Sequence, residues 1–300
     1  MAPITAEQHQ HLLSIVLDCL AGRNIEVVAD GWAVADRDRG GVYGLINLSQ
    51  ELRGIPETEW PELVRRRVSM LDGITPDLPE TFELAAPKLR IRLTADGSEP
   101  GWAAFRNVCD GLDQQLMLRN EVGCVTVTGE TLKKWGVGAD LAFAAALERT
   151  VWDEPRERRV LAKGDLRLSW VRASFFASSL LLDLRHLLTA KNRYGALAMV
   201  PCRDALLFAE IEDDRIVRAA ASMIEVGGQW YSDGPGSISP DVFWFRRDGS
   251  ITRVVKAADG GYDPCWGRDF SAVLADLEPH RSPRSPSTKK GRRSGTRQRS

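Results

Sequence analysis

The sequence predicts an α+β fold, with mostly antiparallel sheets and helices packed on them. Helical and strand-like segments follow one another in irregular order, unlike the regular alternation of a doubly wound parallel sheet. Most neighbouring strand segments are joined by turn residues, as in hairpins. The clearest pair is Ala196–Val200 and Ala205–Phe208, on either side of the turn Pro201–Asp204. Each run is long enough for a buried strand and too short for a helix.

The composition is that of an ordinary globular chain. Its 300 residues suffice for one large domain or for two closely packed lobes, and both alternatives stay open. The five cysteines are scattered without a C-x-x-C pair, so we expect neither a zinc site nor a dithiol redox motif. There is no signal-like N-terminus and no apolar run approaching about 18 residues. We therefore expect a cytoplasmic protein without membrane partner, metal or cofactor.

The first 72 residues are predicted to form an N-terminal α+β lobe. Thr5 and Gln8 form a capping box, apolar residues then recur at helical spacing, and Gly22 is a natural stop. The other elements predicted here are strands at Ile25–Ala29, Trp32–Ala35 and Val42–Leu48 and a helix at Glu57–Leu71. The Pro-rich segment 73–88 is predicted to connect this lobe to the rest.

Residues 89–279 are predicted to form the main α+β lobe. Asp248-Gly249 between two apolar runs is a strong hairpin signal, and the alternation in Leu89–Leu93 indicates a strand. The further predicted strands are Gln115–Leu118, Cys124–Val127, Leu166–Val171, Val242–Phe245 and Ile251–Val255. The predicted helices are Thr131–Trp135, Ala139–Trp152, Ala177–Lys191, Asp213–Val226 and Phe270–Leu277.

The last 21 residues, 280–300, differ in charge from the rest. They hold eight of the 40 basic residues and none of the 41 acidic ones, which leaves an acidic body of 32 basic against 41 acidic residues. With no apolar residue to bury, this segment is predicted to be a disordered tail. Its charge predicts weak, salt-dependent binding of nucleic acid or another polyanion. The residues expected to carry that binding are Arg284, Lys289, Lys290, Arg292, Arg293, Arg297 and Arg299.

Five stretches resemble, in order, the YtpQ family of uncharacterised bacterial proteins. They are IEVVADGWAVADRDRGGVYGLINLSQ, TGETLKKWGVGADLAFAAALERT, FFASSLLL, MVPCRDALLFAE and SPDVFWFRRDG. In the third stretch Ser179 stands where the family has a basic residue. The resemblance implies a shared domain of unknown function, and it brings no substrate, cofactor or catalytic residue to this chain.

Two groups of residues are candidates for chemistry or binding. Cys202 next to Arg203 could be a nucleophile with a lowered pKa, for which His186 is the only base in the core region. The alternative is that Cys202 is a small turn residue and His186 a partly buried helix residue. Binding is predicted instead at Arg203 and Asp204 in the turn, and at the aromatic C-terminal quarter. The candidates in that quarter are Trp244, Arg246 and Arg247.

Three functions remain open at this stage. The favoured one is a non-enzymatic interaction module, adaptor or immunity-like, that presents the Pro201–Asp204 turn or the aromatic quarter to a protein partner. The second is an enzyme with an unfamiliar site, for which Arg203, Asp204, Arg172 and His186 would cluster in one pocket. The third is a polyanion binder that acts through the tail. The sequence assigns no catalytic residue and leaves the oligomeric state undetermined.

Overall fold

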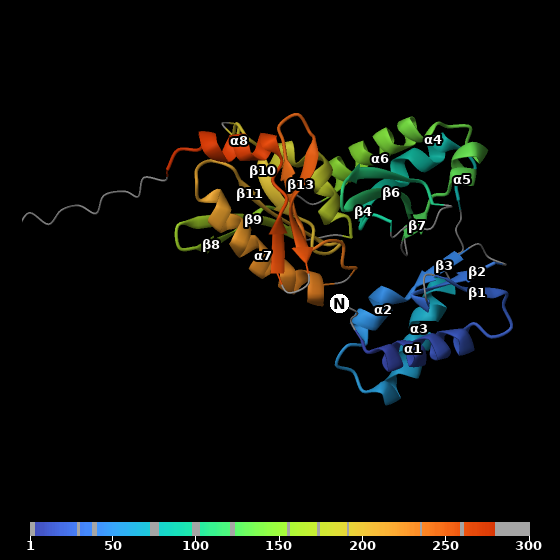
Figure 1. The fold of residues 1–300 in the computed structure, drawn as a ribbon. Helices are drawn as coiled ribbons and strands as arrows, with labels where there is room; N and C mark the ends of the chain where they lie inside the picture. Colours follow the sequence, from blue (N-terminus) through green and yellow to red (C-terminus); the bar gives the residue numbers. More distant parts are fainter. Residues whose placement is uncertain are drawn as a thin grey trace, which may run out of the picture.

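Across the residues that it describes, the computed structural model combines helices with three antiparallel sheets (Figure 1), which confirms the predicted α+β class. The tail predicted at 280–300 lies outside the described residues. The structure describes residues 4–28, 31–37, 41–72, 78–97, 103–120, 124–154, 157–172, 175–190, 192–234, 236–258 and 261–279.

The N-terminal part packs a three-stranded meander with helices around a core of its own. The predicted capping box is present, since Thr5 Oγ1 accepts from Gln8 N at 3.2 Å and Gln8 Oε1 from Thr5 N at 3.1 Å. The core cluster takes all its buried members from residues 4–68. The elements are α1 (Ala6–Cys19), β1 (Ile25–Val28), β2 (Ala33–Asp36), β3 (Gly41–Gly44), α2 (Leu45–Glu51), η2 (Glu57–Glu59) and α3 (Trp60–Asp72).

One predicted strand in this part is partly wrong. The segment Val42–Leu48 is strand only as far as Gly44, and Leu45 begins helix α2. Leu45 and Leu48 are buried, and their spacing of three residues places both on the inner face of a helix. The segment therefore becomes helical from Leu45 onward, because burying both leucines on one helix face outweighs its β-like composition.

The middle part is a four-stranded sheet covered by helix α6. Strand β6 pairs with β4 on one side and with β5 and β7 on the other, and β6 and β7 correspond to the predicted strands Gln115–Leu118 and Cys124–Val127. Thr150 of α6 accepts a hydrogen bond from Ile91 N at 2.8 Å. The elements are α4 (Phe82–Ala85), η3 (Ala86–Lys88), β4 (Leu89–Thr94), β5 (Phe105–Cys109), β6 (Leu112–Arg119), β7 (Cys124–Thr126), α5 (Gly129–Lys134) and α6 (Ala139–Asp153).

The C-terminal part is a seven-stranded sheet in the order β14-β13-β12-β10-β11-β9-β8. Its centre is the predicted hairpin of β10 and β11, in register from Ala196 opposite Glu210 to Met199 opposite Leu207. The predicted helix at 177–191 is a 3₁₀ helix with a break at Asp183. The elements are β8 (Arg159–Lys163), β9 (Leu166–Arg172), η4 (Ala177–Leu187), β10 (Ala196–Met199), β11 (Ala205–Glu210), α7 (Ile216–Asp233), β12 (Val242–Phe245), β13 (Ile251–Ala258), β14 (Gly261–Pro264) and α8 (Arg268–Asp276).

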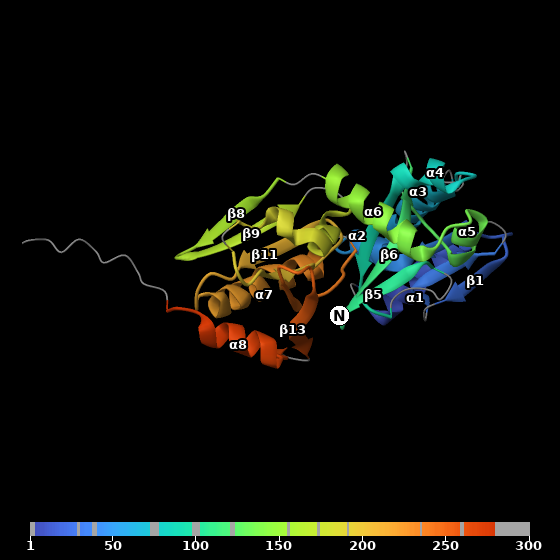
Figure 2. The same ribbon diagram turned by 90° about the horizontal axis from the view of Figure 1, so that it is seen from above.

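Both faces of this sheet are covered, which explains why its central strands are apolar throughout. Successive side chains alternate between faces, so Ala198 and Phe208 pack against η4, whereas Leu197 and Leu207 pack against α7. We call these the η4 face and the α7/α8 face. Seen from above, α7 and α8 lie together on one side of the sheet (Figure 2).

The η4 face is also the joint with the middle sheet. Leu93 of β4 and Leu112 of β6 belong to the same buried cluster as the η4 leucines. Ser179, fully buried, accepts a hydrogen bond from Leu93 N at 3.2 Å. A basic side chain at this position would have to be buried between η4 and β4, so the small hydroxyl suits the packing of this chain.

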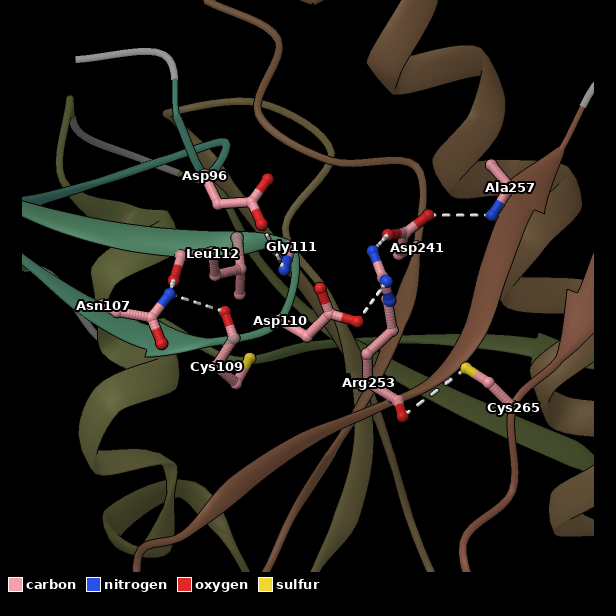
Figure 3. A network of polar contacts seen from close by, with 10 residues as sticks. All are labelled: Asp96, Asn107, Cys109, Asp110, Gly111, Leu112, Asp241, Arg253, Ala257 and Cys265. Atoms are coloured by element: carbon pink, nitrogen blue, oxygen red, sulfur yellow. Dashed lines mark hydrogen bonds and ion pairs between the residues drawn. The ribbon is translucent and has the colours of Figure 1, made fainter.

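A second joint between the two sheets is made by Arg253 of β13 (Figure 3). Its Nη1 lies 3.1 Å from Asp241 Oδ2, and its Nη2 pairs with Asp110 in the β5–β6 turn. Asp241 also accepts from Ala257 N at 2.8 Å. Gly111 follows Asp110 with φ of +92°, and a Cβ there would lie 2.9 Å from Arg253 Nη1, so the turn requires glycine.

The N-terminal part meets the C-terminal part through α2. Gln50 accepts from Gly236 N at 2.9 Å and donates to Ser237 Oγ at 2.6 Å. Beyond the helix, Arg53 lies 3.3 Å from Asp233 at the end of α7. These polar contacts bring α2 to the loop that follows α7.

Candidate functional site

The Pro201–Asp204 turn, the first predicted site, is largely inside the molecule. Pro201 and Cys202 are buried, and Arg203 and Asp204 are partly buried. Arg203 N donates to Gly236 O at 3.0 Å, and Ser178 N donates to Arg203 O at 3.2 Å. The turn is therefore a fixed corner between η4 and the loop after α7.

Cys202 has the environment of an inert thiol. Burial is the main cause that raises its pKa to about 12, and the hydrogen bond it donates to Asp204 Oδ1 at 3.1 Å raises it further. The hypothesis of a lowered pKa at Cys202 is wrong, because burial and Asp204 outweigh the opposing charge of Arg172. A thiol held protonated in this way is a poor nucleophile.

The four residues proposed to share a pocket do not come together as one group. Asp204 pairs with Arg172 at 3.3 Å. His186 instead contacts Asp183 on its own helix, with 2.9 Å between Nε2 and Oδ2, and its ring lies 6.2 Å from that of Trp152. The structure thus joins Arg172, Asp204 and Cys202.

Trp244 and Arg246 lie where the sheet meets α8. Trp244 is 4% exposed, and its Nε1 donates to Tyr194 O at 2.8 Å. The Arg246 guanidinium lies 4.2 Å from the Trp244 ring centre and pairs with Asp269 of α8 at 3.1 Å. These contacts fasten α8 to the sheet.

Arg247 holds the loop before β10. It donates to the carbonyls of Thr189, Ala190 and Asn192 at 2.6 to 3.0 Å. The loop ends at Gly195 with φ of +84°, where a Cβ would lie 1.9 Å from Phe245 O. Arg247 is thus engaged within the fold.

The C-terminal quarter of the chain, together with α7 and Leu197 of β10, forms an apolar groove on the α7/α8 face. Its volume is about 190 Å³. Val217 is 48% exposed, Trp266 42% and Tyr262 38%. The residues that line this apolar groove are Leu197, Ile216, Val217, Ala220, Ala221, Ile224, Val254, Val255, Tyr262, Pro264, Trp266, Phe270 and Leu274.

Local sequence explains why the groove is open. Along α7, Ala220 and Ala221 are too small to fill the space between this helix and α8. On the other side Trp266 packs edge-on against Phe270, with ring centres 6.1 Å apart, and stands at the rim. The groove therefore has aliphatic and aromatic walls and can accept an apolar group.

Other kinds of site find no support in the described ranges. Across those ranges no three His, Cys, Asp or Glu side chains gather as a metal ion would need. No helix of the described part has the length and hydropathy to cross a bilayer. The predicted polyanion-binding residues between Arg284 and Arg299 lie outside the described residues.

Comparison with protein-family models, with curated proteins and with solved structures finds no match for this chain. The resemblance to the YtpQ family therefore stays a prediction.

Sequence reasoning missed the part that α7 plays in the groove. Tyr262 and Trp266 fall within the aromatic C-terminal quarter that the sequence predicts to bind, but Val217 lies outside it. The available signal was the apolar pair Ile216-Val217 at the start of a helix. One of two adjacent helix residues must point away from a narrow inner stripe.

Proposed function

We propose that this protein is a non-enzymatic interaction module, adaptor or immunity-like, that holds a protein partner in the apolar groove. The observation that carries the proposal is the exposure of Val217, Tyr262 and Trp266 around one apolar hollow. Exposed apolar patches on folded proteins commonly mark binding surfaces, and Trp and Tyr are enriched among residues that dominate binding energy.

The mode of binding follows from the shape and chemistry of the groove. Its walls offer few hydrogen-bonding groups, so specificity would come from the fit of an apolar side chain or of one face of a short helix. The partner would therefore present a Leu, Met or aromatic anchor to Trp266. All five cysteines are unpaired, which supports our proposal of a cytoplasmic protein.

Matched substitutions test the proposal in the full-length protein. Val217→Glu places a charge in the groove, and Leu141→Glu places one on α6 at a residue that is 59% exposed. We expect Val217→Glu to weaken the affinity for a purified partner by at least about tenfold, because the introduced charge would have to be desolvated on binding. Leu141→Glu should leave the affinity unchanged. Equal affinities for wild type and Val217→Glu would contradict the proposal.

A third variant separates this function from binding through residues 280–300. Glutamine at all eight basic positions of that segment removes its charge and leaves the groove intact. Retention of the partner by this variant is the expected result. Its loss, together with normal binding by Val217→Glu, would assign binding to the basic segment instead.

A further inference from the structure

Helices α2 and α3 of the N-terminal part enclose a cavity of about 330 Å³. On the α2 side, Leu48 is followed at i+3 and i+4 by a glutamate and a leucine that also line the cavity. On α3, Leu63 is followed at the same intervals by two arginines. Residues at this spacing share one face of a helix. The cavity therefore lies between two helix faces that each combine apolar and charged side chains.

Most of the cavity wall is apolar. Its apolar side chains are Leu48, Leu52, Ile55 and Leu63. Leu52 is buried, whereas Leu63 is 36% exposed although it is a large apolar residue. An apolar group inside the cavity would remove this surface of Leu63 from water, which is favourable.

The turn after α2 holds Ile55 in this wall. Ile55 N donates to Leu52 O at 3.0 Å, and Ile55 O accepts from Trp60 Nε1 at 3.0 Å. Trp60 belongs to the core of the N-terminal part and is 1% exposed. Gly54 within the turn has φ of +79°, a conformation that favours glycine. The wall is thus anchored to the core, and the cavity is preformed.

Three charged side chains line the same cavity. Arg67 of α3 forms an ion pair with Glu51 of α2, so these two charges offset each other. Arg66 forms no ion pair within the described ranges. Its neighbour Arg65 points elsewhere and pairs with Glu62 at 2.9 Å on the exposed side of α3. The lining of the cavity therefore carries a net charge of +1, which resides on Arg66.

We propose that this cavity binds an aliphatic monocarboxylate, with the carboxylate at Arg66 and the hydrocarbon chain against Leu48, Leu52 and Leu63. A carboxylate carries a single negative charge at neutral pH, which matches the net charge of the lining. The planar guanidinium can donate two parallel hydrogen bonds to the two carboxylate oxygens. The volume is at the lower end of small-molecule pockets, so a chain of medium length is expected.

This site is separate from the apolar groove. Its lining comes from α2, α3 and the turn between them, whereas the apolar groove is lined by residues from Leu197 to Leu274. Binding of the acid would thus be a further function beyond the proposed protein interaction. Failure of either proposal would leave the other standing.

Calorimetric titration of the full-length protein with sodium octanoate tests the site. Salt near about 150 mM suppresses non-specific attraction to the basic segment. We expect one octanoate per chain, with 1-octanol and octylammonium at least about tenfold weaker because neither offers a carboxylate to Arg66. Acetate, which lacks the chain, should also be weaker. No binding of octanoate, or equal affinity for octanoate and either octanol or acetate, would overturn the proposal.

Two neighbouring arginines provide a matched pair of variants. Arg66→Met should weaken octanoate binding at least about tenfold, since it removes the unpaired charge. Arg65→Met should leave the affinity unchanged. Both side chains are exposed, so neither substitution should disturb the fold. Equal octanoate affinities for Arg66→Met and wild type would overturn the proposal.

Glu51→Gln separates recognition of charge from a structural effect. It raises the net charge of the lining from +1 to +2 by releasing Arg67, so octanoate should bind about two- to fivefold more tightly. Unchanged or weaker binding would contradict the role given to the charges. Val217→Glu in the apolar groove should bind octanoate like wild type, and a loss there would place the acid in the apolar groove and overturn the proposal.

Discussion

The two faces of the seven-stranded sheet are built from the same strands but differ in how completely they are covered. On the η4 face, Phe208 and Phe245 are fully buried under η4 and the middle sheet. On the α7/α8 face, Leu207 and Met223 are equally buried in the core, yet Trp266 at the edge of this face is 42% exposed. The first face joins parts of the molecule, and the second leaves apolar surface beyond what the fold needs.

The largest expected difference between the faces is in stability. Phe208→Ala should lower the free energy of unfolding by about 3–5 kcal/mol, because it leaves a cavity in a closed core. Trp266→Ala should cost less than about 1 kcal/mol, since its ring is partly solvated already. Urea unfolding of the two variants measures both values. Similar losses would mean that Trp266 belongs to the core and that the groove is not open.

The polar joint on the closed side should have the next largest effect. Arg253→Met leaves Asp241, which is 7% exposed, without its ion-pair partner, and should cost about 2–3 kcal/mol. Arg65→Met is the matched control, because Arg65 pairs with Glu62 on an exposed helix face and should change stability by less than about 0.5 kcal/mol. Denaturant titration distinguishes them, and a loss no greater than in the control would refute a structural role for Arg253.

A smaller, chemical difference concerns the turn at the end of β10. With a pKa of about 12, Cys202 holds a thiolate fraction of about 10⁻⁴ near pH 8. Iodoacetamide should therefore label exposed Cys265 first and Cys202 only after unfolding. The folded-state pKa is raised, so the thiolate would gain population only as pH rises toward that value. Peptide mass spectrometry reads both sites, and rapid labelling of Cys202 in the folded protein would contradict this environment.

Local patterns in the sequence predicted most elements, and burial decided where they failed. The hairpin around Pro201–Asp204 was recognisable because its strands are buried on both faces and so are apolar throughout. Strands β5 and β8 were missed, since each lies at a solvated part of its sheet. Phe105 is 45% exposed and Val160 54%, and neither segment shows a clear inside and outside.

The candidate sites were less predictable than the fold, because they depend on contacts between distant segments. The sequence left Trp244 and Arg247 available for binding. In the structure, Tyr194 O accepts from Trp244, and the carbonyls of Thr189, Ala190 and Asn192 accept from Arg247. Conversely, nothing local in the sequence places Arg92 and Arg203 over the same Phe175 ring. That meeting requires β4, η4 and the Pro201–Asp204 turn to pack together, which no spacing in the sequence reveals.

Photo-crosslinking from within the groove tests the central claim most directly. A benzophenone amino acid at position 217 would lie in the apolar groove, and one at position 141 would lie on exposed α6 as a control. We expect position 217 to capture a single protein partner, which mass spectrometry maps to an apolar segment, and position 141 not to capture it. Capture of the same proteins from both positions, or none at 217 while the partner stays bound, would contradict it.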